Sequence, residues 1–171
     1  MNAVAVEAEV LRYLAGYPAA TQAQVQRLVG EGRLGEYLTR RYPDSHAIQT
    51  DRALHDYVME LKQQHLRSSA PLHKVLWQNK MDVLQNVLGL HTSISRVQGS
   101  RLKAKAEIRI ASLFKSAAPE FLEMVVVHEL AHLREREHNK AFYQLCEHLL
   151  PGYHQVEFDL RLLMLHRAAG D

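Results

Sequence analysis

The stretch Val125-Val126-Val127-His128-Glu129-Leu130-Ala131-His132 places the pattern H-E-x-x-H inside an apolar run. Residues four apart share one face of a helix, so His128 and His132 can direct imidazole nitrogens at one metal ion. Glu129 lies one step round the helix, within reach of a water bound to that metal. Apolar flanks predict a buried helix, where two histidines and a carboxylate are costly without a shared partner. The pattern therefore predicts a catalytic Zn²⁺ site with Glu129 as general base.

A third ligand is needed, because catalytic zinc usually has three protein ligands. His138 follows with the metzincin spacing H-E-x-x-H-x5-H, but Glu135 stands where metzincins have a turn-forming glycine. His138 is favoured, because Asn139 can cap a helix over 140–150 and so hold the ligand on a short connection. The alternatives from later in the chain are Glu147, His154 and Glu157.

Composition indicates an ordinary globular protein. The chain has 171 residues, of which 47% are hydrophobic and 23% charged, enough for one good core. A formal net charge of +2 does not by itself indicate nucleic acid as a partner. The single cysteine, Cys146, fits a reducing compartment and lies in an apolar pattern that predicts burial. With neither a signal peptide nor a membrane span in the sequence, we expect a cytoplasmic protein that binds no membrane.

The first ninety residues show mainly helical periodicity. Helices are expected over 4–16, from Thr21 to Gly30, over 32–41, and from Thr50 or Asp51 to about residue 67. The stretch 72–90 is mixed in pattern, with a helix expected after Gln78. These apolar stripes are interpreted as core.

The pattern then changes to strict alternation. From Arg101 to Ile110 every second residue is apolar, which predicts a strand with one buried face. Residues 92–97 are expected to form its partner strand, joined by a hairpin turn at 98–100. Pro119 is suited to the first position of the H-E-x-x-H helix, and Pro151-Gly152 to the end of the following one. A last helix is expected over 156–167.

This order of elements predicts an α+β fold. We expect a single compact domain over 1–171, with a helical N-terminal part over about 1–90. The catalytic part, about 91–171, would hold a small antiparallel-rich sheet, the active-site helix and the C-terminal helices.

The motif and its continuation, His138-Asn139-Lys140-Ala141-Phe142, resemble the YgjP-like metallopeptidase family. That family is allied to the SprT and WLM zincins, which share H-x-x-x-F after the third histidine. The likeness also covers Leu34-Gly35, Arg41-Tyr42-Pro43, and the stretches 89–91, 95–99 and 103–109. By this resemblance the fold is a zincin-like domain, the zinc ligands are His128, His132 and His138, and Glu129 is the general base.

One departure concerns the segment before the alternating strand. Wider relatives carry Arg-Trp-Gly-Ser-Cys there, whereas this chain has Arg96-Val97-Gln98-Gly99-Ser100, without Trp or Cys. The substrate preference that this motif gives its owners is therefore not transferred to this chain.

Three functions fit the motif, and the leading hypothesis is metal-assisted peptide hydrolysis, with an edge strand pairing with an extended substrate. The second keeps the metal but changes the substrate to a nucleoside triphosphate. Arg101, Lys103, Lys105 and Arg109 would line one strand face and could hold phosphates, although such a face is commonly just solvated. The resemblance also implies UTP pyrophosphatase activity. The third is a zinc-stabilised binding module without turnover, which the presence of Glu129 argues against. Side chains that could stabilise an oxyanion are Tyr143, Tyr153 and His154.

Overall fold

The computed structural model describes residues 2–88 and 106–170, and their contacts form two compact units. The first unit contains the chain up to Asp44 and the segment from His154 onward, and the second unit runs from Ser45 to Tyr153. Helices and a small sheet together make the fold α+β, as the sequence predicted. That the whole chain forms one domain stays a prediction.

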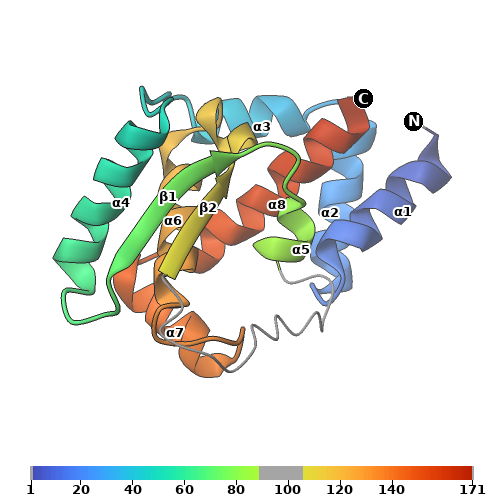
Figure 1. Ribbon diagram of the computed structural model, residues 1–171. Helices are drawn as coiled ribbons and strands as arrows, with labels where there is room; N and C mark the ends of the chain where they lie inside the picture. The colour runs from blue at the N-terminus through green and yellow to red at the C-terminus, as the bar shows by residue number, and fades with distance from the viewer. Residues whose placement is uncertain (1, 89–105, 171) are drawn as a thin grey trace. The chain divides into compact units, whose positions relative to one another are not determined.

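The first unit is helical. It contains α1 (Ala3–Leu14), α2 (Ala19–Gly30), α3 (Leu34–Arg41) and all but the first residue of α8 (Tyr153–Gly170) (Figure 1). Helix α2 starts directly after Pro18 instead of at Thr21, because the fixed φ of proline already suits a helix start. The carboxylate of Asp159, on α8, is fully buried and joins α8 to α3 through Tyr37 and Arg41, at 3.2 and 3.0 Å.

The second unit carries the sheet and the H-E-x-x-H helix. Its elements are α4 (Asp51–His65), β1 (Leu72–Gln78), α5 (Val83–Asn86), β2 (Ala106–Ala111), the 3₁₀ helix η1 (Ser112–Lys115), α6 (Pro119–Ala131) and α7 (Lys140–Leu149). Helix α4 is capped by the Thr50 hydroxyl, which accepts a hydrogen bond of 3.1 Å from the Ala53 amide. Helix α4 packs beside β1, and α6 contacts β2 (Figure 1).

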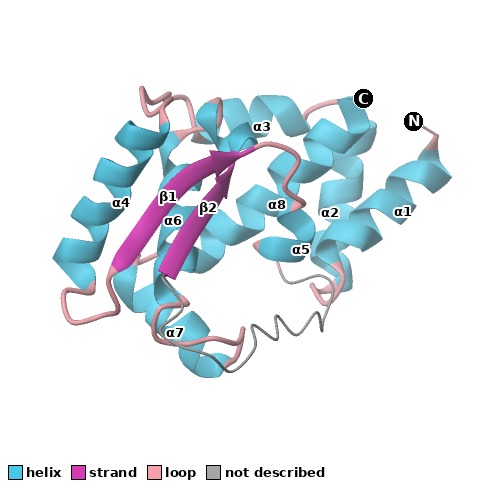
Figure 2. Cartoon of the chain, viewed as in Figure 1, coloured by secondary structure: helices cyan, strands magenta, loops and turns pink. Residues whose placement is uncertain are grey.

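The expected antiparallel sheet is wrong for the strands that the structure describes. Strands β1 and β2 run parallel, with Val75 opposite Ile108 and Trp77 opposite Ile110 (Figure 2). All four of these side chains are buried. A parallel pair needs a long connection, and residues 79–105 separate β1 from β2 in the sequence, of which the structure describes 79–88 with α5. The expected strand at 92–97 and the hairpin turn at 98–100 lie outside the described residues.

The alternating pattern correctly predicted β2. Ile108 and Ile110 are buried while Arg109 between them is exposed, as expected for a strand with one solvent face. Residues 101–105, which carry the rest of the expected basic face, are not among the described residues. Arg109 itself pairs with Glu107 at 2.6 Å.

Helix α6 is the central buried element of the second unit. Pro119 occupies its first turn as expected, and nine of its residues from Phe121 to Ala131 are buried. Cys146, on α7, is buried, which confirms the burial that its apolar pattern predicted. Within residues 2–88 and 106–170, no helix combines the length and apolar character needed to cross a membrane.

Candidate metal centre

Both histidines of the motif lie at the C-terminal end of α6. The regular helix ends at Ala131, but its cap residue His132 keeps right-handed helical dihedrals, with φ −64° and ψ −14°. The four-residue spacing therefore still places His128 and His132 on one face. His128 is fully buried and His132 is partly exposed, so the pair lies where the core meets solvent.

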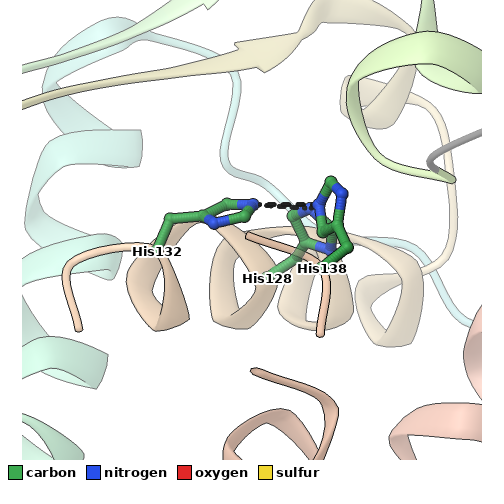
Figure 3. Close-up of side chains that lie close together, drawn as sticks. All are labelled: His128, His132 and His138. Atoms are coloured by element: carbon green, nitrogen blue, oxygen red, sulfur yellow. Dashed lines mark hydrogen bonds between the residues drawn. The ribbon is translucent and has the colours of Figure 1, made fainter. Parts of the chain in front are cut away.

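The third histidine completes a compact cluster. The Nε2 atoms of His128 and His132 lie 3.3 Å apart, and each lies 3.0 Å from Nε2 of His138 (Figure 3). Three nitrogens at about 2.0 to 2.1 Å from one tetrahedral zinc ion would be separated by about 3.3 Å. Within the described part of the chain, this trio is also the group that could hold a metal ion. The donor set therefore fits zinc.

The chain reaches His138 without the metzincin glycine. After α6 the amides of Leu133, Arg134 and Glu135 bond to carbonyls of the last helical turn, at 3.0 Å each. Among the described non-glycine residues only Lys80 has a positive φ, so Glu135 makes the turn without strain. Asn139 then caps α7 as predicted, because its side-chain oxygen accepts a hydrogen bond of 2.9 Å from the Phe142 amide. The short connection thus holds His138 between α6 and α7.

The alternative third ligands have other contacts. Glu147 accepts a hydrogen bond of 2.8 Å from the Gly152 amide. Glu157 belongs to the first unit, where it forms a buried ion pair with Arg161 at 3.1 Å. His154 is exposed in the same unit. None of the three is part of the histidine cluster among the described residues.

The outer nitrogens of the two helical histidines face uncharged oxygen atoms. Nδ1 of His128 lies 2.8 Å from the hydroxyl of Tyr153, and Nδ1 of His132 lies 2.9 Å from the carbonyl oxygen of Glu135. A hydrogen on Nδ1 leaves the lone pair of Nε2 free for a metal. The Tyr153 hydroxyl thus lies behind His128, on the side away from Nε2.

Phe142 forms an apolar platform under the cluster. Its buried ring stacks on His132 with centroids 4.4 Å apart and meets His128 and His138 edge-on, each at 4.9 Å. The sequence marked Phe142 only through the family-like H-x-x-x-F pattern. No local signal assigned its contact with three imidazoles.

Burial sets the protonation state of His128. Desolvation lowers the pKa of this histidine well below its usual value, and the neighbouring His132 and His138 lower it further. The neutral imidazole, the form that binds a metal, is therefore favoured at neutral pH.

This pKa shift predicts an acid-sensitive metal-free protein. His128 stays neutral in the folded state while an unfolded histidine takes up a proton below about pH 6.5, so the unfolded state binds more protons there. The contribution of neutral His128 to the free energy of unfolding is complete above that pH and is lost as the pH falls below it. Thermal melts of the metal-free protein are recorded from pH 7.5 to 5. As the pH falls, the slope of Tm against pH should be smaller for His128→Gln than for the parent. Equal slopes would contradict the prediction.

The remaining motif residue, Glu129, lies on α6 between the two histidines and is partly exposed. A carboxylate that directly follows the first ligand histidine on the same helix is the expected general base for metal-assisted hydrolysis, and that role stays a prediction.

The α+β fold carries a three-histidine cluster that could hold a metal ion, an arrangement compatible with a metal-dependent hydrolase. The sequence profile of the family described as YgjP-like, metallopeptidase domain, matches residues 6–162, and the chain belongs to this family. It is also similar to the UTP pyrophosphatase of Escherichia coli strain K12, with 56% identity over 160 residues. That match covers 94% of this chain and 96% of the relative. No solved structure matches the chain significantly.

Proposed function

We propose that this protein is a zinc-dependent hydrolase that releases pyrophosphate from UTP. The observation that carries this proposal is the 56% identity to a UTP pyrophosphatase over nearly the whole of both chains. In this proposal His128, His132 and His138 hold the metal and Glu129 is the catalytic base.

The charge of the site supports an anionic substrate. His128 is kept neutral by burial, and the outer nitrogens of His128 and His132 face a hydroxyl and a peptide carbonyl. Neither acceptor carries a charge that would offset a bound divalent cation. A triphosphate therefore has a more favourable electrostatic interaction with such a centre than a neutral peptide carbonyl has.

The mechanism assigns one task to each group. A zinc ion, when bound, would supply Lewis acidity to the reacting oxygens. Glu129 accepts a proton from the attacking water while the water oxygen forms a bond to the α-phosphorus. The bond from that phosphorus to the bridging oxygen breaks, and pyrophosphate leaves with the electron pair. Glu129 then returns its proton, giving UMP and pyrophosphate. Phe142 excludes water from the buried side of the cluster.

The test is a comparison of substrates on one preparation. Purified zinc-loaded protein is incubated with UTP, CTP, ATP and GTP, and pyrophosphate release is followed with a coupled assay. We expect UTP to be the best substrate, and release to stop when a chelator removes the metal and resume when zinc is added back. A folded, zinc-loaded protein that releases no pyrophosphate from UTP would contradict the proposal.

Peptide hydrolysis is the second candidate, favoured by the H-E-x-x-H geometry and by the metallopeptidase description of the family. Among the described residues, β2 pairs with β1 alone, so its other edge could receive an extended peptide by strand addition. The same preparation should be incubated with an unstructured peptide library. Cleavage of peptides without turnover of UTP would replace the first candidate by the second.

A further inference from the structure

One phenol of the second unit is buried directly against the histidine cluster. Tyr153 and His128 both have no exposed surface, and the Tyr153 hydroxyl oxygen lies 2.8 Å from Nδ1 of His128. His128 is the most buried of the three candidate ligands, so water cannot replace this contact. The orientation of the His128 ring therefore depends on its hydrogen bond with the Tyr153 hydroxyl.

We propose that Tyr153 is a positioning residue, whose hydroxyl oxygen accepts the Nδ1 hydrogen of His128 and so keeps Nε2 of His128 unprotonated and directed at the metal. The inference rests on the metal centre proposed above. It follows from the chemistry of imidazole, in which a proton on one nitrogen of the neutral ring leaves the other as the ligand.

The turn before α8 holds the phenol in place. Gly152 has φ +87°, a conformation that suits glycine, and its amide donates to the Glu147 carboxylate at 2.8 Å. The Tyr153 amide donates to the Leu150 carbonyl at 2.9 Å. Both bonds anchor the backbone immediately before the Cα that carries the ring. Glu147, which the sequence offered as a ligand, thus helps to place Tyr153.

The two helical histidines differ in how their tautomers are set. His132 faces a peptide carbonyl, which can only accept, so the backbone alone requires a hydrogen on its Nδ1. A hydroxyl can accept or donate, and metal binding at Nε2 requires that it accept from His128. The Tyr153 contact is therefore the one of the two that a side-chain substitution can remove.

Tyr153→Phe tests the inference, because it keeps the buried ring and deletes only the hydroxyl. We expect zinc to bind about 10- to 100-fold more weakly, as found for outer partners of ligating histidines. Zinc affinity is measured by competition with a chromophoric chelator. Long-range ¹⁵N–¹H spectra of the metal-free protein at pH 7.5 should show His128 protonated on Nδ1 in the wild type. In the variant, a larger fraction should be protonated on Nε2.

The matched control is Tyr57→Phe, which removes the hydroxyl of a half-buried tyrosine on α4 in the same unit. It should change neither zinc affinity nor the His128 spectrum. Unchanged affinity and an unchanged tautomer in Tyr153→Phe would overturn the inference. So would a wild-type spectrum with His128 protonated on Nε2, a result that needs no variant to fold. A wild type that binds no zinc would instead contradict the proposed function, and the spectra of the metal-free protein would still test Tyr153.

Discussion

Replacing Glu129 by glutamine is expected to abolish most turnover while leaving the fold and the metal in place. Glutamine matches glutamate in size but cannot take a proton from the attacking water. Loss of a positioned general base lowers kcat by about 10²- to 10⁴-fold. Glu129 is partly exposed at the end of α6, so the substitution should leave the packing of the buried helix intact.

The measurement is pyrophosphate release at saturating UTP and zinc, together with the zinc content of each preparation. Glu123→Gln is the matched control, because Glu123 is another partly exposed carboxylate on α6 and lies outside the H-E-x-x-H motif. It should retain turnover. A Glu129→Gln protein as active as its parent would rule out the mechanism, whichever substrate the enzyme uses.

The parts of the site that sequence could predict are those set by local geometry. His128 and His132 share a helix face because of their spacing, and the apolar flanks gave the burial of that helix. His138 follows after a short turn, and the Asn139 cap that favoured it as a ligand is present. These predictions needed no knowledge of how distant segments pack.

The parts that the sequence did not predict depend on distant segments. Strand β1 has only Val75 and Trp77 as buried alternating residues, and its partner comes after a long crossover. Its parallel register is a property of the tertiary structure. Tyr153 lies 25 residues after His128, and nothing in its immediate sequence indicates that its hydroxyl meets an imidazole. The helix end at Pro151-Gly152 could be predicted, but the contact that the following tyrosine makes is visible only in three dimensions.

The same limit applies to the choice of substrate. The H-E-x-x-H pattern specifies metal-assisted hydrolysis, but the bond that is cleaved depends on groups around the metal. The neutral oxygen atoms behind His128 and His132 became apparent only in the structure, and their lack of charge is one of the observations that support the proposal of an anionic substrate.

His138→Ala is expected to remove the metal without unfolding the protein. His138 is exposed, so its side chain contributes little to the core, yet its Nε2 lies 3.0 Å from both other ligand nitrogens. Deleting a direct ligand should weaken zinc binding by more than about 100-fold. Loss of a residue that only hydrogen-bonds to a ligand already lowers the metal affinity by about 10- to 100-fold. Zinc at 100 times its Kd should stabilise the wild type by about 2.7 kcal/mol and the variant by far less.

Chelator competition gives the affinity, and thermal melts with and without zinc give the stabilisation. His148→Ala is the control, because His148 is an exposed histidine on α7 and is not part of the cluster. It should bind zinc as the wild type does. Undiminished zinc binding in His138→Ala would mean that another side chain completes the site, which would return Glu147, His154 and Glu157 as candidates. Loss of zinc in His138→Ala, with His148→Ala unaffected, would show that the two histidines of the buried helix need the ligand from the exposed connection to hold the metal.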